Sequence, residues 1–254
     1  SRVRNGLWMH AVYNAAKGGV HGLTTGLARE MAPFGVTVNT VAPSGTLTPE
    51  IAEYVKGARI PGHFVEFGTF RGYTARWMAT LMAELGLAGE LWLYDSFEGL
   101  PEHASDVDRT SYEIAQHKVW RPGSMKLESG IETRIEASLS SVLGGGRVRV
   151  VKGFFDRTLP ERSPPGPIAL AHVDCDLYAS ARCVLDHLFS RGLLQDGGVL
   201  VCDDWNCNRA NPRLGERRAL AEALEAHPRW EAEPWFSYGW HGQAFFLHDR
   251  EAHR

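Results

Sequence analysis

The stretch I-A-L-A-H-V-D-C-D-L-Y (168–178) decides the fold of this chain. Its apolar run, residues 168–174, predicts a β-strand that ends in the acidic residues Asp174 and Asp176. The amphipathic pattern A-S-A-R-C-V-L-D-H-L-F-S-R-G-L-L (179–194) follows and predicts a helix that D-G-G ends. A strand followed by a helix is the repeating unit of a mainly parallel sheet with right-handed crossovers.

The same alternation continues on both sides of this stretch. It predicts further strands over 63–67, 90–95, 147–153 and 198–204, and further helices after residue 72 and over 131–143 and 216–227. Segments 230–236 and 243–249 alternate around a glycine-containing turn and predict a terminal antiparallel hairpin. The polar segment 102–130 predicts a lid or irregular helices. The fold class is therefore α/β, with a Rossmann-like, mainly parallel sheet and helices on both faces.

The first fifty residues have a different pattern. Residues 13–32 carry an apolar stripe at helical spacing, Val20, Leu23, Leu27 and Met31, and Pro33 and Gly35 should stop that helix. V-T-V-N-T-V-A (36–42) predicts a strand. We therefore expect two parts, an N-terminal fragment over 1–47 and a complete α/β domain over 48–254.

Polar or glycine-rich groups follow the first three strands of that domain, where an open α/β sheet binds its ligand. The candidate ligand-binding residues are Glu66, Gly68, Thr69, Gly72, Asp95, Ser96, Phe155 and Asp156. The glycines allow close approach of the backbone, and Asp95 could accept hydrogen bonds from a ribose diol. Each signal alone also fits a plainer role, such as a tight turn, a helix cap or a core aromatic.

Four carboxylates follow the next two strands, Asp174 and Asp176 after one and Asp203 and Asp204 after the other. Because neighbouring parallel strands end at one rim of the sheet, these carboxylates should converge and raise one another's pKa. A divalent cation would remove that conflict, and oxygen ligands favour Mg²⁺, Mn²⁺ or Ca²⁺ over zinc. The alternative is that the carboxylates face water or cap helices.

The blocks F-V-E-F-G-T-F-R-G-Y-T-A, L-Y-D-S-F-E-G-L-P, H-V-D-C-D-L-Y-A-S and G-G-V-L-V-C-D-D-W resemble the macrocin and novobiocin-type O-methyltransferases over nearly all of 62–249. The resemblance implies the class I methyltransferase fold, with S-adenosyl-L-methionine at the first three strand ends. It implies Mg²⁺ or another hard divalent cation on Asp174, Asp203 and Asp204, and Asp176 as the general base. Which of Asp174 and Asp176 binds the metal stays open.

The resemblance also implies a small-molecule acceptor hydroxyl, on a sugar or another diol-bearing natural product, and a homodimer. The aromatic residues of F-S-Y-G-W-H-G (236–242) and the segment 102–130 could wall the acceptor pocket. His103, His172 and His241 are interpreted as rim or core residues. A cofactor-binding or scaffold protein without activity is the alternative.

Residues 13–42 resemble the short-chain dehydrogenase/reductase family, in which a Tyr and a Lys four residues later lie one helical turn apart, as Tyr13 and Lys17 do. Asn39 falls in the matching strand. The glycine-rich turn that binds the nicotinamide cofactor in that family is missing before Tyr13, so we interpret 1–47 as a fragment of a dehydrogenase.

The composition of the chain argues against a nucleic-acid-binding protein and a membrane protein. A formal net charge of -3 over 254 residues gives no electrostatic reason to expect a nucleic acid partner. No apolar run approaches the roughly 20 residues that a membrane helix needs, and no signal peptide is recognisable. The four cysteines form no C-x-x-C pair, which favours reduced thiols in a cytoplasmic protein.

Overall fold

The computed structural model describes residues 11–39, 49–144 and 146–252. The chain divides into two compact units, Ser1–Ser44 and Gly45–Arg254, and each is described by itself.

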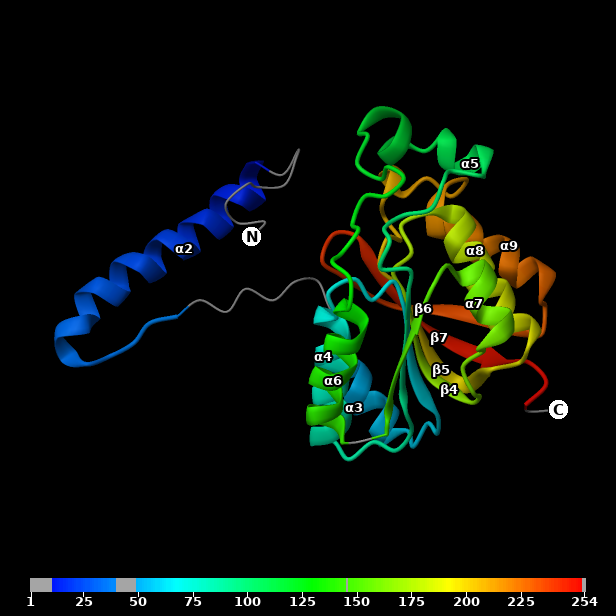
Figure 1. The fold of residues 1–254 in the computed structure, drawn as a ribbon, viewed down its shortest axis with the longest axis horizontal. Coiled ribbons are helices and arrows are strands. Elements are labelled where there is room, and N and C mark those ends of the chain that lie inside the picture. The colour runs from blue at the N-terminus through cyan, green and yellow to red at the C-terminus, as the bar shows by residue number, and fades with distance from the viewer. Residues whose placement is uncertain (1–10, 40–48, 145, 253–254) are drawn as a thin grey trace. The chain divides into compact units, whose positions relative to one another are not determined.

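The second unit is built on a seven-stranded sheet in the order β3-β2-β1-β4-β5-β7-β6 (Figure 1). The strands are β1 (His63–Phe67), β2 (Leu91–Asp95), β3 (Val148–Lys152), β4 (Ile168–Val173), β5 (Leu194–Cys202), β6 (Trp230–Tyr238) and β7 (Gly242–Asp249). Strands β1 to β5 pair in parallel, and β7 and β6 add an antiparallel hairpin at the β5 edge. The predicted α/β fold class is confirmed.

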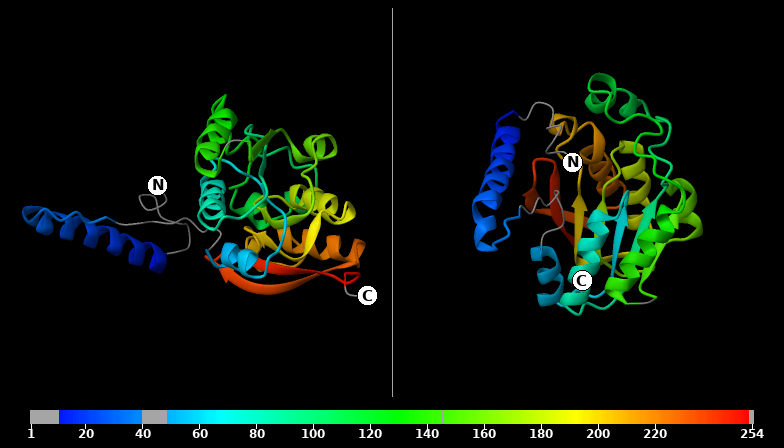
Figure 2. Two further views of the ribbon diagram at one scale, coloured as in Figure 1. Left: turned by 90° about the horizontal axis from the view of Figure 1, so that it is seen from below. Right: turned by 60° about the vertical axis from the view of Figure 1, so that its left-hand side comes forward.

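Helices cover both faces of this sheet (Figures 1 and 2). One layer holds α3 (Pro49–Gly57), α4 (Tyr73–Glu84) and α6 (Ile131–Leu143), and the other holds α7 (Phe155–Glu161), α8 (Tyr178–Ser190) and α9 (Gly215–Ala226). Each layer packs its apolar stripe on the sheet, with Met78 and Leu139 in one core and Val184 and Leu220 in the other. The predicted face of α4 is correct, since Ala75, Met78, Ala79 and Met82 are fully buried.

Two predicted boundaries of the second unit are wrong. The helix predicted over 179–194 ends at Ser190, because Gly192 has a φ of 59° and Leu194 already pairs with Ile168 in the sheet. Strand β5 accordingly begins four residues earlier than its predicted start at residue 198. Helix α7 was not predicted, because Gly153 lies just before it and Pro160 lies within its last turn, and both residues disfavour a helix in the sequence pattern.

The segment 102–130 contains irregular helices, as predicted: α5 (Asp106–Arg109) and a π-helical turn, η2 (Tyr112–Gln116). It lies at the end of the sheet where the parallel strands terminate (Figure 1). A short 3₁₀ turn, η3 (Asn208–Ala210), follows β5 and contacts η2.

The first unit contains one long helix, α2 (Ala11–Met31), on which Tyr13 and Lys17 occur. It ends as predicted, with the 3₁₀ turn η1 (Ala32–Phe34) and Gly35 in the left-handed region at a φ of 70°. No described helix is long and apolar enough to cross a membrane, α2 with its 21 residues included.

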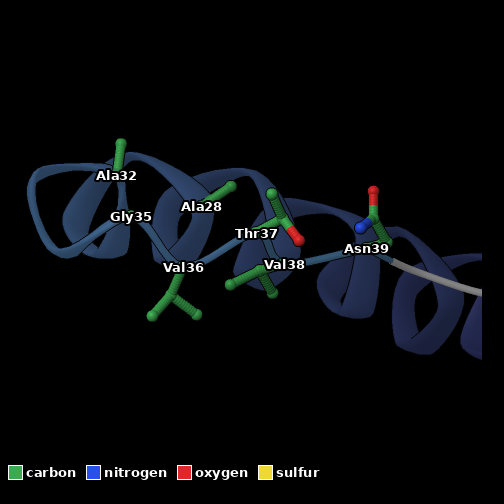
Figure 3. Close-up of a pocket in the computed structure, with 7 residues that line it drawn as sticks. All are labelled: Ala28, Ala32, Gly35, Val36, Thr37, Val38 and Asn39. Carbon is green, nitrogen blue, oxygen red and sulfur yellow. The ribbon is translucent and has the colours of Figure 1, made fainter.

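The strand predicted over 36–42 is wrong for its described part, residues 36–39, which are irregular. A strand needs a neighbour to pair with, and the described residues of this unit contain none. Instead the segment runs back beside α2 and lines a shallow groove of about 430 Å³ with Ala28 and Ala32 (Figure 3). Residues 40–42 of the prediction lie outside the described residues.

We propose that the domain boundary lies near residue 48, because α3 belongs to the second unit. Ile51 and Ala52 are fully buried and Val55 is 2% exposed.

A chain that starts at Thr48 should melt at the temperature of the full chain. A chain that starts at Gly62 loses α3 and should melt at least about 5 °C lower, because burying each large aliphatic side chain contributes about 1.5–3 kcal/mol. Differential scanning calorimetry of the three chains checks this. Equal destabilisation of both shortened chains would place the boundary elsewhere.

Candidate functional site

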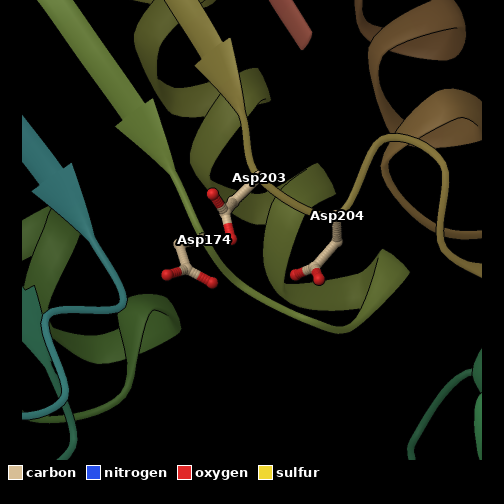
Figure 4. Close-up of side chains that lie close together, drawn as sticks. All are labelled: Asp174, Asp203 and Asp204. Atoms are coloured by element: carbon tan, nitrogen blue, oxygen red, sulfur yellow. The ribbon is translucent and has the colours of Figure 1, made fainter. Parts of the chain in front are cut away.

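Three carboxylates meet at the carboxyl ends of β4 and β5. Asp174 directly follows β4, and Asp203 and Asp204 directly follow β5. One carboxylate oxygen from each lies within 4.8 Å of the other two, and all three side chains are partly buried (Figure 4). Hydrogen bonds from the Asp174 amide to the Phe67 carbonyl and from the Asp203 amide to the Val173 carbonyl, each 2.9 Å, extend the sheet to this point. Parallel pairing therefore brings the predicted carboxylates together.

These carboxylates repel one another. Burial and the nearby charges of Asp203 and Asp204 raise the pKa of Asp174 well above its ordinary value. Burial and Asp203 raise the pKa of Asp204 to about 6. A divalent cation would offset this repulsion, and a set of three carboxylates without His or Cys suits a hard cation. The residues present therefore fit the metal that the sequence predicts.

Asp176 lies beside this cluster and is not one of its three members. Its backbone has a φ of 59°, and its amide donates a 3.0 Å hydrogen bond to Asp204 Oδ2. The geometry favours Asp174 over Asp176 as the third metal ligand. Asp176 is partly buried, which suits contact with a bound molecule.

The loop after β1 passes directly over the chain that leaves β4. Gly68 has a φ of 98°, and a Cβ at this position would lie 1.7 Å from the Asp174 carbonyl oxygen. Thr69 is 4% exposed, and its hydroxyl makes no hydrogen bond among the described residues. Gly72 begins α4 at a φ of 72° and offers no side-chain cap. A buried hydroxyl and a glycine turn of this kind fit a bound small molecule.

The other predicted cofactor residues have different surroundings. Asp95 accepts hydrogen bonds from the amides of Phe70 (2.7 Å) and Phe97 (2.6 Å), which leaves further lone pairs for a ligand. The Ser96 hydroxyl donates to the Gly99 carbonyl within a turn, at 2.9 Å.

Beyond β3, the Phe155 ring packs edge-on against Phe67, with 6.0 Å between centroids, and Asp156 is exposed in the first turn of α7. Phe155 therefore packs as a core aromatic, which was the alternative to a role in ligand binding. Its role toward a cofactor stays a prediction, as does that of Asp156.

His172 connects the two halves of the site. Its Nδ1 lies 3.2 Å from Glu66 Oε1, and its Nε2 lies 3.7 Å from Asp203 Oδ1, beyond hydrogen-bond distance. Both His172 and Glu66 are 1% exposed. Burial alone would lower the pKa of His172, but the two carboxylates raise it to about 9. The two carboxylates therefore favour the protonated form of this buried ring, while burial raises the pKa of Glu66.

Three further side chains fix the acidic loop, and sequence reasoning missed this role for them. The Tyr238 hydroxyl donates to Asp203 Oδ1 at 2.9 Å, and His241 Nδ1 lies 2.7 Å from the Asp203 carbonyl oxygen. Glu216, 1% exposed at the start of α9, accepts from the Asp204 amide at 2.9 Å. Tyr238, His241 and Glu216 are distant from Asp203 in the sequence, so these contacts could not be inferred from spacing. They depend on how α9 and the β6–β7 hairpin pack.

The segment 102–130 is tied to both acidic loops. Asp108, 2% exposed, accepts hydrogen bonds from the amides of Tyr178 (2.7 Å) and Ala179 (3.1 Å) at the start of α8. Glu113 and Asn208 exchange reciprocal amide-to-side-chain hydrogen bonds of 3.2 Å. This segment is therefore held against the loops that carry the carboxylates.

Comparison with known proteins finds two families, whose matched residues overlap at 46–58. The sequence profile of the family described as Macrocin-O-methyltransferase (TylF) matches residues 46–226, more than half of the chain. The profile described as short chain dehydrogenase matches residues 3–58.

Individual relatives agree with this division. The chain is 34% identical over 154 residues to the 8-demethyl-8-(2,3-dimethoxy-alpha-L-rhamnosyl)-tetracenomycin-C 4'-O-methyltransferase of Streptomyces olivaceus, which covers 60% of this chain and 56% of that protein. It is 68% identical over 56 residues to the 2,3-dihydroxy-2,3-dihydro-p-cumate dehydrogenase of Pseudomonas putida, 22% of this chain and 21% of that protein. The chain thus spans about half and about a fifth of the lengths of these relatives.

The solved structure of the O-methyltransferase NovP is similar, with a TM-score of 0.59 over 78% of this chain and 76% of that chain, at 23% identity. At this identity the likeness concerns the fold, and it agrees with the class I methyltransferase architecture predicted from the sequence.

The raised pKa of Asp204 predicts how metal and pH act together on stability. A carboxyl whose pKa is higher when folded stabilises the fold below its ordinary value of 3.8, and this stabilisation is lost as the pH rises through about 6. We expect 10 mM MgCl₂ to raise the melting temperature more at pH 7.5 than at pH 5. Asp204→Asn, which removes the charge, should shrink the shift at pH 7.5. Equal shifts at the two pH values in the unaltered chain would contradict a cation among these carboxylates.

Glu216 should act by holding the Asp204 backbone. Burial raises the pKa of Glu216 well above its ordinary value, so the neutral isostere Glu216→Gln should keep the hydrogen bond and the Mg²⁺-dependent melting shift. Glu216→Ala leaves a buried amide without its acceptor, which costs about 1–3 kcal/mol, and should reduce that shift. Thermal melts with and without Mg²⁺ compare the two. An equal loss in both variants would show that the carboxylic acid itself is required.

Proposed function

Because this chain belongs to the macrocin-O-methyltransferase (TylF) family, we propose that it transfers a methyl group from S-adenosyl-L-methionine to a hydroxyl of a sugar-bearing small molecule, with the help of a divalent cation. The arrangement of Asp174, Asp203 and Asp204 beside the glycine turn 68–72 carries this proposal. It places candidate groups for metal binding and for cofactor binding at adjacent strand ends.

The proposed cofactor site lies at the ends of β1, β2 and β3. Glu66, Gly68 and Thr69 would line it on one side and Asp95 on the other, where it would accept from the ribose hydroxyls. The support is the burial of Thr69 and Glu66 next to the glycine turn, where their polar groups face each other and the end of β1. Bound S-adenosyl-L-methionine supplies an electrophilic methyl group on sulfur.

The proposed metal ligands are Asp174, Asp203 and Asp204. A divalent cation, Mg²⁺ for preference, supplies Lewis acidity that lowers the pKa of a coordinated hydroxyl. The chain itself orients this site through Tyr238, His241 and Glu216. Asp176, adjacent to the cluster, would accept the proton that the acceptor hydroxyl loses as its oxygen attacks the methyl carbon.

The acceptor that we propose is a glycoside. The relative from Streptomyces olivaceus is named as a 4'-O-methyltransferase of a tetracenomycin that carries a rhamnosyl group. Vicinal hydroxyls of such a sugar suit a carboxylate-bound cation, because two oxygens can approach the same ion.

The N-terminal unit enters this proposal only as a dehydrogenase-like fragment. We propose no dehydrogenase activity, because the similarity covers 22% of the chain and the described residues of that unit form a helix without a sheet. The homodimer implied by the sequence resemblance stays a prediction, which analytical ultracentrifugation of the full chain tests.

Two variants separate the metal role from the base role. Asp204→Ala should abolish both the Mg²⁺-dependent melting shift and methyl transfer, while the Kd for S-adenosylhomocysteine stays within about threefold of the original value. Asp176→Asn should keep that Kd and the Mg²⁺ shift and lower kcat by about 10²–10⁴-fold, the usual contribution of general base catalysis. Calorimetric titration and a radiolabel transfer assay measure these quantities. If S-adenosylhomocysteine affinity fell as steeply as turnover in Asp204→Ala, the metal assignment would fail.

A further inference from the structure

A groove lies between α4 and α6, which are neighbours in one helical layer of the second unit (Figure 1). Its volume is about 260 Å³. The two helices approach each other closely there: Gly72 lines the groove, and a Cβ at this position would lie 3.2 Å from Ile135 Cγ2. Ile135 and Leu139 also line the groove and are 6% and 2% exposed, so part of its lining is well-packed apolar surface.

The charged lining of this groove is entirely positive. Arg71 and Arg76 come from the start of α4, and Arg134 comes from the first turn of α6. No acidic residue of the described part of the chain lines the groove. Arg134 forms an ion pair with Glu128, which lies outside the groove. Arg71 and Arg76 make no ion pair among the described residues, so two guanidinium charges remain without a counter-ion there.

Contacts with neutral groups hold these two guanidinium groups beside the groove. Arg76 donates a 3.1 Å hydrogen bond to the hydroxyl of Ser138, which also lines the groove from α6. The Arg71 guanidinium lies over the Phe70 ring, 5.4 Å from its centroid. A guanidinium has five N–H donors, so each side chain keeps donors for a further partner.

The chemistry of this lining suits an organic oxyanion. Guanidinium groups bind phosphate oxygens in bidentate fashion, and a dianion would offset the repulsion among three like charges. We propose that the groove binds a phosphorylated small molecule, with the phosphate between Arg71, Arg76 and Arg134 and the organic part against Ile135 and Leu139. A volume just below the range of about 300–1,000 Å³ that is usual for small-molecule sites favours a compact ligand over a polypeptide.

This site is distinct from the one that the proposed function uses. The carboxylates Asp174, Asp203 and Asp204 would bind a cation at the ends of β4 and β5, whereas the groove lies between two helices and would bind an anion. Gly72 belongs both to the groove and to the proposed cofactor turn. The test therefore has to show that the anion and the cofactor bind independently.

Calorimetric titration of the full chain with phenyl phosphate, at constant ionic strength and without Mg²⁺, tests the proposal. Phenyl phosphate should bind, and inorganic phosphate should bind at least about threefold more weakly, because it has no group to place on the apolar lining. Phenol, which lacks the anion, should not bind. Saturating S-adenosylhomocysteine should leave the Kd for phenyl phosphate unchanged.

Three variants locate the binding. Arg76→Gln should weaken phenyl phosphate binding at least about fivefold, because hydrogen bonds from a charged donor to the anion are lost. Arg76→Lys keeps the charge without the planar fork and should give an intermediate Kd. Arg191→Gln is the matched control, since Arg191 is also exposed but lies at the end of α8 in the opposite helical layer, and it should bind as the unaltered chain does.

Four results would overturn the proposal. Phenyl phosphate could fail to bind at concentrations up to about 5 mM, or bind no more tightly than inorganic phosphate. Arg76→Gln could keep the original affinity, or lose no more of it than Arg191→Gln. Displacement of phenyl phosphate by S-adenosylhomocysteine would assign the groove to the cofactor instead. Methyl transfer is measured separately, so the proposed function can fail while the anion site stands, and the reverse.

Discussion

The contact that the rest of the site depends on is the His172 imidazole between Glu66 and Asp203. Ionisable groups taken out of water are tolerated only when they are well placed with respect to one another. The parallel pairing of β1 with β4 sets Glu66 directly beside His172, and β5 delivers Asp203 to its other side. The strand order β1-β4-β5 therefore places one buried imidazole between the proposed cofactor side and the proposed metal side.

Much of this arrangement could be predicted from the sequence, because it follows from local rules. Apolar runs of four to seven residues marked the strands, and polar residues placed just after them had to meet at one rim. The convergence of Asp174, Asp203 and Asp204 needed nothing more than parallel pairing. The glycine turn after β1 was predicted as a place where a ligand approaches the backbone, and the structure adds that Gly68 lies against the Asp174 carbonyl.

What escaped prediction depends on contacts distant in sequence. Glu216 reaches the Asp204 amide only because α9 packs on the sheet, and no spacing in the sequence records that. His172 is a buried residue, in agreement with its interpretation as a rim or core residue, but its positions 3.2 Å from Glu66 and 3.7 Å from Asp203 link strands that are distant in sequence. The strand predicted over 36–42 is an element that was predicted and is not observed in its described part. The β-branched pattern was present, but a strand also needs a neighbouring strand to pair with.

The contact between Gly68 and the Asp174 carbonyl has a consequence for how such a protein can change over evolutionary time. With no room for a Cβ, position 68 is closed to every chiral amino acid unless two strand ends move apart together. Gly242 in the β6–β7 hairpin is restricted in a similar way, because a Cβ there would lie 2.1 Å from the Tyr238 ring. Evolutionary change in this scaffold is thus restricted on both sides of the carboxylates, and it has to proceed through residues whose side chains have room to vary.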